Sequence, residues 1–175
     1  MAHLDHLWAG WRSAFVSGAA DAPPELGGGG ESCVFCRILA SGLPDSETNI
    51  IWRHPGGKVV AILNAYPYTS GHLMAMPVRH VAELEDLSSD EAAQLWEAVT
   101  RAVSALKAAY KPGGVNIGAN LGRAAGAGVP DHFHMHVLPR WVGDTNFMTA
   151  VADARVLPEP LGESAAKLRS GWPAG

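Results

Sequence analysis

The sequence predicts one α+β domain, in which an antiparallel sheet packs against one long helix. Two short strand-like runs come first, a single long helical stripe follows, and two more strand-like runs come after it. This order favours an antiparallel sheet over repeated strand–helix–strand units. The length of 175 residues suits one domain with terminal extensions, and a hydrophobic share of 47% is enough for a core.

The first two predicted strands lie on either side of a turn. Residues 58–63 are apolar and rich in β-branched side chains after Lys58 and are followed by Asn64, which predicts a strand that ends there. Residues 65–71 hold proline, serine and glycine, which favour turns, and residues 72–76 form a second apolar run before Pro77.

The long helix is predicted to begin at a cap, Ser88 or Ser89, and to run to about Tyr110. Pro112 and two glycines end it. Apolar residues recur on one face at helical spacing: Leu95, Val99, Ala102, Leu106 and Tyr110. After the helix, residues 115–119 and 132–138 are predicted strands, and a glycine-rich loop over residues 120–131 separates them.

The two ends of the chain differ from this middle part. Leu4, Trp8, Trp11 and Phe15 form one helical face near the N-terminus, and Gly27 to Gly30 mark a linker. We therefore expect an N-terminal arm and linker over residues 1–31, a domain over residues 32–150 and a C-terminal extension over residues 151–175. The aromatic arm is expected to dock onto the core or onto a second subunit.

Charge and hydropathy narrow the possible partners. A net charge of −4 argues against broad nucleic-acid binding, but it leaves room for a small anionic ligand held by local cations or backbone amides. No stretch is long and apolar enough to span a membrane, and the N-terminal stretch lacks the features of a secretion signal. A cytoplasmic location is the expectation.

Three histidines alternate in the last predicted strand, at positions 132, 134 and 136. Alternate strand residues share one face at steps of about 6.6 Å, so the three imidazoles would lie side by side. Three ordinary histidines and a tri-histidine metal site are the alternatives to a nucleophile. The preceding glycine loop favours the nucleophile, because its backbone amides could hold an anion close to a neutral imidazole.

Cys33 and Cys36 supply two ligands at the spacing of a structural zinc site. Two further ligands would be needed to complete it. Buried free thiols and a redox pair are the alternatives.

The histidine cluster, which is followed by Val137 and Leu138, is similar to the motif of the histidine-triad family. The resemblance covers the chain from about Cys33 to Met148. Within the family, residues 7–12 and 139–147 look closest to the bacterial diadenosine tetraphosphate phosphorylases and related dinucleoside polyphosphate hydrolases. The stretch from Asn64 to His72 resembles the nucleotide-side strand and turn of the family.

The resemblance implies an enzyme that forms a covalent nucleotidyl-histidine and passes the nucleotide to water or inorganic phosphate. The expected catalytic residues are His132, His134 and His136, with His134 as the nucleophile and His136 in contact with the phosphate. Asn120 and the amides of the glycine loop would hold phosphate, and the Asn64 region would lie beside the ribose. The expected substrate-binding residues are Asn64, Asn120, Gly126, Gly128 and His136.

The resemblance also implies a homodimer whose sheets join across the subunits. Many family members place Ser or Thr where this chain has Gly128, so one side-chain donor to phosphate is absent. Related triad proteins complete the zinc site with two histidines, and the matching residues are His80 and His132. We therefore expect one structural zinc per chain on Cys33, Cys36, His80 and His132. A nucleotide-binding regulatory module and a metal-dependent hydrolase that uses the triad as ligands stay as alternatives.

Overall fold

The computed structural model describes residues 33–144 and 159–173. The predicted aromatic arm, the glycine linker and the segment over residues 145–158 lie outside the described residues. Among those that are described, no helix is long and apolar enough to cross a membrane.

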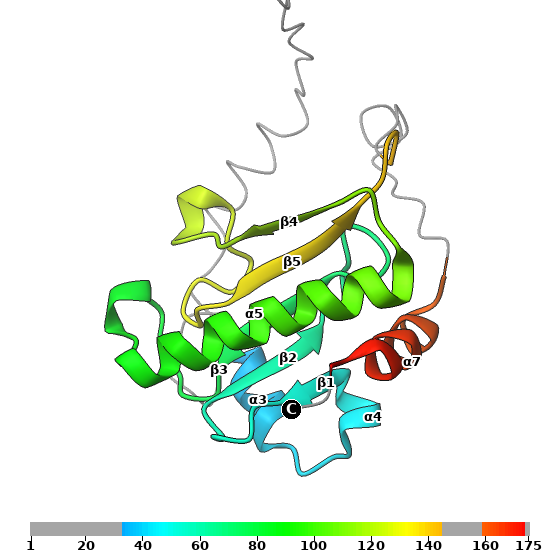
Figure 1. Cartoon of the computed structure of the whole chain (residues 1–175). Helices are drawn as coiled ribbons and strands as arrows, with labels where there is room; N and C mark the ends of the chain where they lie inside the picture. Colours follow the sequence, from blue (N-terminus) through cyan, green and yellow to red (C-terminus); the bar gives the residue numbers. More distant parts are fainter. Residues whose placement is uncertain (1–32, 145–158, 174–175) are drawn as a thin grey trace, which may run out of the picture.

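The centre of the fold is an antiparallel sheet of five strands in the order β1-β2-β3-β5-β4 (Figure 1). The predicted α+β class with an antiparallel sheet is therefore confirmed. The strands are β1 (Ile50–Arg53), β2 (Val59–Leu63), β3 (Leu73–Pro77), β4 (Gly114–Gly118) and β5 (Met135–Arg140). Strand β4 lies at one edge of the sheet, and it pairs with β5 so that Gly118 is opposite His136.

One long helix, α5 (Ser89–Tyr110), crosses one face of this sheet (Figure 1). Its predicted start is confirmed: the Ser88 hydroxyl accepts a hydrogen bond from the Glu91 backbone N–H, and the Glu91 carboxylate accepts one from the Ser88 N–H. Arg79, which follows β3, donates two hydrogen bonds of 2.9 and 2.8 Å to the same carboxylate. These bonds, above all those from Arg79, hold the pKa of Glu91 at about 2 and fix the helix start to the sheet.

The alternating side chains of the sheet form two cores, one on each face. Val59 and Leu63 of β2 pack towards α5, whereas Val60 and Ile62 pack on the opposite side. The second core is covered by α3 (Val34–Ala40), whose Phe35 is buried there. A sheet covered on both faces explains why β2 and β3 are buried along their whole length.

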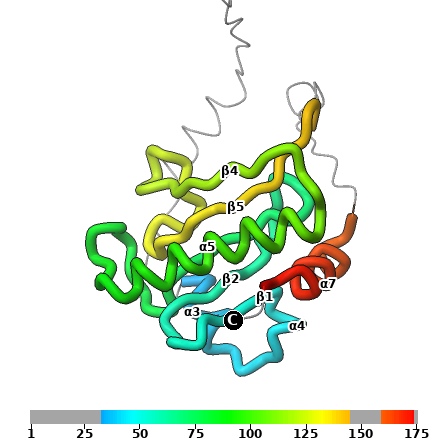
Figure 2. The backbone as a smooth tube through the Cα atoms, viewed as in Figure 1, coloured from blue at the N-terminus to red at the C-terminus, as the bar shows by residue number. Residues whose placement is uncertain are grey.

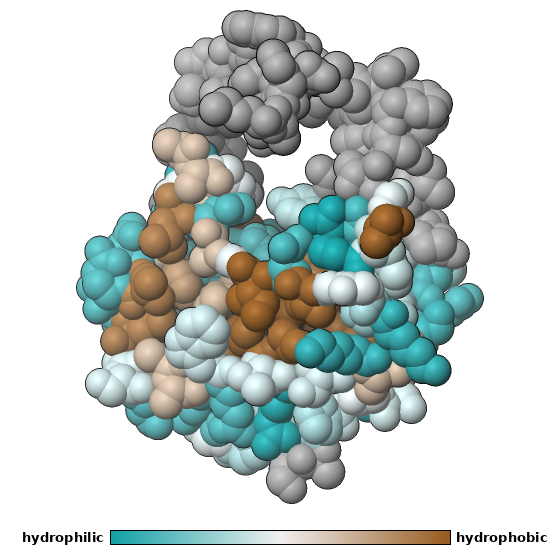
Figure 3. Space-filling view, turned by 45° about the horizontal axis from the view of Figure 1, so that its top comes forward, coloured by the Kyte–Doolittle hydropathy of each residue, from teal (hydrophilic) through white to brown (hydrophobic). Residues whose placement is uncertain are grey.

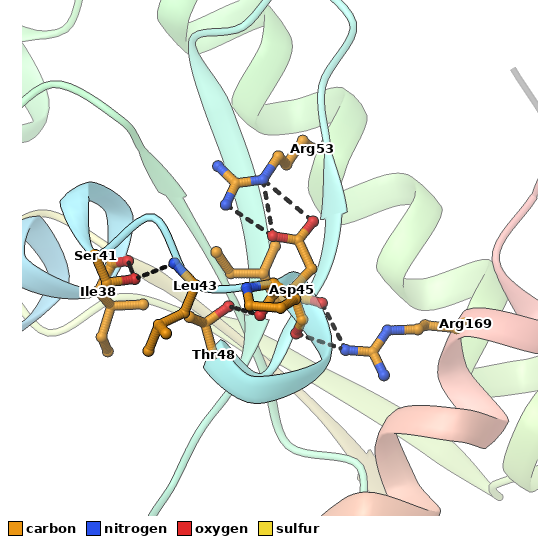
Figure 4. A network of polar contacts seen from close by, with 9 residues as sticks. Ile38, Ser41, Leu43, Asp45, Thr48, Arg53 and Arg169 are labelled. Atoms are coloured by element: carbon orange, nitrogen blue, oxygen red, sulfur yellow. Dashed lines mark hydrogen bonds and ion pairs between the residues drawn. The ribbon is translucent and has the colours of Figure 1, made fainter.

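Helix α7 (Leu161–Gly171) was not predicted from the sequence, although it lies in the predicted C-terminal extension. It packs beside α5 and β1, which come much earlier in the sequence (Figure 2). Arg169 donates hydrogen bonds to the carbonyls of Asp45 and Ile50, which ties it to the short helix α4 (Asp45–Thr48) and to β1 (Figure 4). After the helix, the Trp172 ring stacks on Trp52 at 5.5 Å.

The strand that carries the triad begins later than predicted. It starts at Met135 instead of His132, and it continues through Pro139 to Arg140. The reason is a turn and bend at Asp131 and His132, after which the Phe133 N–H donates to the Val81 carbonyl instead of joining the ladder. Only His136 of the triad therefore lies in the strand proper.

The loop between β4 and β5 contains one short 3-10 turn, η3 (Arg123–Ala125), and a second such turn, η2 (Leu84–Asp86), precedes α5. The segment over residues 120–131 is otherwise irregular, as predicted.

Candidate functional site

His134 and His136 lie side by side at the end of the sheet, with ring centroids 4.9 Å apart. Both are almost buried, with 6% and 8% of their surfaces exposed. The Phe35 ring contacts His134 edge-on at 5.2 Å and His132 at 5.5 Å, so α3 supports both histidines from one side. This role of Phe35 was not predicted from the sequence.

The tautomer of His134 follows from one hydrogen bond. Its Nδ1 lies 2.8 Å from the backbone carbonyl of His132. Because a carbonyl can only accept, Nδ1 carries the proton, and the neutral ring keeps a free electron pair on Nε2. Burial lowers the pKa of His134 and outweighs the raising effect of this hydrogen bond, which favours the neutral, nucleophilic form near pH 7.

His136 is oriented by a chain of hydrogen bonds that starts at the backbone. The Tyr68 N–H donates to His72 Nδ1 at 3.1 Å, so the neutral His72 ring carries its proton on Nε2. That Nε2 donates to His136 Nδ1 at 2.9 Å. His136 therefore accepts on Nδ1 and carries its own proton on Nε2, which makes it a hydrogen-bond donor towards a ligand.

Asn64 reinforces this chain instead of ending it. Its Oδ1 accepts from the Tyr66 N–H at 2.9 Å, which fixes the orientation of the amide, and its Nδ2 lies 3.3 Å from His72 Nδ1. His72 is fully buried. In this structure Asn64 supports His72, and its predicted contact with the ribose stays a prediction. The part played by His72 was not predicted from the sequence, where the available signal was a histidine after Gly71 at the start of an apolar run.

The electrostatics of His136 keep it neutral. Burial, followed by the charge of a neighbouring protonated His134, lowers the pKa of His136 to about 4. Near pH 7 it therefore donates a hydrogen bond from Nε2 without carrying a full charge.

The four predicted metal ligands come together in one cluster, which includes His132, two residues before His134. The sulfurs of Cys33 and Cys36 and one nitrogen each of His80 and His132 all lie within 4.8 Å of one another. Cys33 Sγ lies 3.4 Å from His132 Nδ1, Cys36 Sγ lies 3.3 Å from His80 Nδ1, and Cys36 Sγ lies 3.6 Å from His132 Nδ1. Ordinary zinc–sulfur and zinc–nitrogen bonds in a tetrahedron place sulfur and nitrogen about 3.6 Å apart, so these residues fit zinc.

The tautomer of His132 suits the same purpose. Its Nε2 donates to the Pro77 carbonyl at 2.9 Å, which leaves the electron pair on Nδ1, the nitrogen that faces the two sulfurs. Burial, followed by the neighbouring Cys33, raises the pKa of the Cys36 thiol to about 11, and a bound cation would favour its thiolate form. The triad does not converge as one ligand set, since His132 faces sulfur and His134 Nδ1 is already bonded.

The glycine loop begins and ends beside the triad. It leaves β4 after Gly118, opposite His136, and returns at His132. Asn120 Nδ2 donates to the Gly126 carbonyl at 3.4 Å, and the Gly126 N–H donates to the Arg123 carbonyl at 2.9 Å. Among the bonds between described residues, the Gly128 N–H has no acceptor, so it is available to an anion while the Gly126 N–H is engaged. The phosphate contacts of Asn120, Gly126 and Gly128 stay predictions.

The domain has an α+β fold, neighbouring histidines whose ring nitrogens are fixed by hydrogen bonds, and a closed Cys/His cluster beside them. These features together define a histidine-triad domain. The family model described as "HIT domain" matches residues 45–142. The match covers more than half of the chain, and the chain belongs to the HIT domain family.

Named relatives narrow this class. The chain is 37% identical over 169 residues to a protein of Mycobacterium tuberculosis named AP-4-A phosphorylase, covering 97% of this chain and 85% of that protein. It is 31% identical to "Protein hit" of Bacillus subtilis, over 63% of this chain and 72% of that protein. The predicted family is therefore confirmed, and the relatives support a nucleotide-processing enzyme.

Solved structures agree on the fold. A zinc-bound histidine-triad family protein from Mycobacterium smegmatis superposes with a TM-score of 0.65 at 31% identity, covering 82% of this chain and 94% of that one. A Hit-like protein from Bartonella henselae superposes with a TM-score of 0.63 over 79% of this chain, at 21% identity, and supports the fold alone. Together with the Cys/His cluster, the zinc-bound neighbour supports a zinc site in this chain.

Proposed function

We propose that the chain cleaves dinucleoside polyphosphates such as diadenosine tetraphosphate through a covalent nucleotide on His134. The observation that carries this proposal is the Nδ1–carbonyl hydrogen bond of His134, which leaves Nε2 free as a nucleophile. The likeness to a relative named AP-4-A phosphorylase supports the substrate class.

In the first step, the Nε2 electron pair of His134 attacks a phosphorus of the substrate. A nitrogen–phosphorus bond forms, and the bond from phosphorus to the bridging oxygen breaks, so the remaining polyphosphate leaves with that electron pair. The imidazole ring gains positive charge as the bond forms. The His132 carbonyl, which accepts the Nδ1 proton, stabilises that charge.

His136 acts on the phosphate oxygens during both steps. Its Nε2–H donates a hydrogen bond to a non-bridging oxygen, where negative charge collects in the transition state. His72 and the Tyr68 N–H hold that proton on the correct nitrogen. In the second step, water or inorganic phosphate attacks the same phosphorus, the nitrogen–phosphorus bond breaks, and His134 is restored.

Zinc supplies structural support in this proposal. Cys33, Cys36, His80 and His132 would hold one ion, and four protein ligands leave no position open for substrate. The cluster contributes to the reaction by positioning His134. It links the start of α3 to His132, whose carbonyl sets the tautomer of His134.

A homodimer joined through the sheet is part of the same proposal. Strand β4 is an edge strand, and an exposed edge offers unpaired backbone groups to a second copy. Figure 3 shows hydrophobic side chains gathered near the middle of one face of the molecule. Ile117 of β4 and Trp96 of α5 are 46% and 58% exposed. Sedimentation at micromolar concentration tests this part, and a protein that stays monomeric contradicts it.

Two measurements test the reaction. Rapid quenching with diadenosine tetraphosphate followed by peptide mass spectrometry should find adenylate on His134, and the variant His134→Ala should carry none. Product analysis with and without inorganic phosphate then separates two outcomes: ADP and ATP that need phosphate indicate phosphorolysis, and AMP and ATP indicate hydrolysis. A parent enzyme that turns over without any nucleotidyl-histidine would contradict the proposal.

A further inference from the structure

We propose that Arg123 binds the phosphates beyond the one attacked by His134 and thereby selects substrates with a long polyphosphate chain. The inference rests on the function proposed above. It assigns a specificity-determining role to a residue that no motif of the triad includes.

The position of Arg123 follows from the strand register. The glycine loop leaves β4 at Gly118, which pairs with His136, and it returns at His132. Arg123 comes five positions after Gly118, so even an extended chain would span at most about 18 Å. The loop is curled by its own bonds, and Arg123 therefore lies closer to Gly118, the partner of His136, than that limit.

The loop backbone is already closed around Arg123. Its carbonyl accepts from the Gly126 N–H at 2.9 Å, and the Gly122 carbonyl accepts from the Ala127 N–H at 3.4 Å. Gly122 and Gly126 have φ angles of +74° and +90°, which explains glycine at both positions. A loop that holds its own shape loses less conformational freedom when a ligand binds.

Arg123 is also set apart from the other cations of the described residues. Most of those lysines and arginines already bind a carboxylate or a carbonyl: Arg53, Lys58, Arg79, Arg101, Arg140, Lys167 and Arg169. The described cations without such a partner are Arg37, Lys107, Lys111 and Arg123.

The remaining free cations lie elsewhere. Arg37 is two residues from Phe35 on α3, about 200° around the helix, so it faces away from the side that contacts His134. Lys107 and Lys111 lie at the end of α5, near the Gly114 end of β4, whereas the triad adjoins the Gly118 end. Among the residues that the structure describes, Arg123 is therefore the free cation on the segment that flanks the triad.

The chemistry of the ligand fits this position. A polyphosphate chain carries several negative charges, and the protein itself has a net charge of −4. A local cation is therefore needed to offset the repulsion between them. A guanidinium binds two phosphate oxygens at once and stays charged at any pH of interest. Held on the departing phosphates, it would also stabilise the charge that the leaving group gains as its bond breaks.

The test compares Arg123→Ala with a matched control, Arg37→Ala, on two substrates. One is diadenosine tetraphosphate, and the other is an aryl ester of AMP, which has no further phosphate. Arg123→Ala should raise KM for the tetraphosphate at least about tenfold, as expected for the loss of one charge-assisted hydrogen bond, and should leave KM for the ester unchanged. Arg123→Lys should keep part of the parent's low KM for the tetraphosphate, since lysine keeps the charge but cannot bind two phosphate oxygens as a guanidinium does.

Salt and the intermediate separate the possible failures. The tetraphosphate advantage of the parent over Arg123→Ala should shrink as ionic strength rises. If Arg123→Ala keeps the parent's ratio of the two KM values while the parent still forms nucleotidyl-His134, the role of Arg123 is overturned and the proposed function stands. If the parent forms no nucleotidyl-His134, the proposed function itself fails.

Discussion

His132 and His134 are two residues apart, yet the structure prepares them for opposite tasks. His132 donates from Nε2 to the Pro77 carbonyl and presents Nδ1 to two sulfurs. His134 donates from Nδ1 to the His132 carbonyl and keeps Nε2 free. The difference shows that a backbone acceptor selects the tautomer, and the tautomer selects the chemistry.

The two histidines are also coupled. The carbonyl that fixes His134 belongs to His132, and the ring of His132 faces the Cys33 sulfur. Phe35 packs against both rings. Changes at His134 should affect the reaction first and leave zinc binding in place, whereas changes on the metal side should affect stability first and the reaction through it.

The largest expected effect is that of His134→Ala. Removal of a covalent nucleophile can lower the rate on the order of 10⁶-fold, and the zinc content should not change because the cluster does not use this ring. Single-turnover rates and elemental analysis of the same sample check both parts. Turnover within tenfold of the parent would rule out His134 as the nucleophile.

The sequence predicted β2, β3, the capped start of α5 and the clustering of Cys33 and Cys36 with two histidines. Hydrophobic periodicity and a capping pattern carry the strands and the helix start along short stretches of chain, whereas the two histidine ligands were expected only from the resemblance to the histidine-triad family. The sequence did not predict α7, because the buried positions of that helix are Ser164, Ala165 and Leu168, which form a weak apolar pattern. The short strand β1 was missed as well.

The prediction that residues 132–138 form a strand was wrong at its beginning. A pattern of alternating residues says nothing of the Val81 carbonyl, which lies far away in sequence and draws Phe133 out of the ladder. The tautomers were equally out of reach, since each depends on a partner brought in by the fold. His72 acts on His136 across 64 positions of the chain.

The next effect in size concerns the metal side of the comparison. Cys33→Ser should abolish zinc binding and lower the free energy of unfolding by several kcal/mol, because the binding energy of a structural metal is folding energy. Elemental analysis and denaturant unfolding measure the two quantities, with the exposed Ser46→Ala as a control. A metal-free parent with full activity and unchanged stability would return the cysteines to the role of buried thiols.

Acidification should sharpen the comparison on the His136 side. Its folded pKa of about 4 lies below the ordinary value, so the unfolded chain binds the proton first as the pH falls. The contribution of His136 to the free energy of unfolding is therefore complete above about pH 6.5 and is lost progressively as the pH falls to about 4. By pH 5 the loss from this single group is about 2 kcal/mol.

The variant His136→Asn isolates that contribution from zinc release, which acid also promotes. Between pH 7 and pH 5, the parent should lose about 2 kcal/mol more free energy of unfolding than the variant. Denaturant titrations at the two pH values measure it. Equal losses in the two proteins would mean that His136 is not held neutral by its surroundings.

The smallest expected effect is that of Asn64→Ala. Two donors, Asn64 Nδ2 and the Tyr68 N–H, hold His72 Nδ1 as an acceptor, so the loss of one leaves the tautomer in place but less firmly fixed. We expect kcat to fall about tenfold, the effect of one neutral hydrogen bond, with zinc content and the pH-dependence of unfolding unchanged. Tyr66→Ala is the matched control, because its ring is 87% exposed and its N–H to Asn64 Oδ1 survives the substitution. A rise in KM with unchanged kcat would point instead to a direct contact between Asn64 and the ribose, and would move Asn64 from the support of His72 to the binding of substrate.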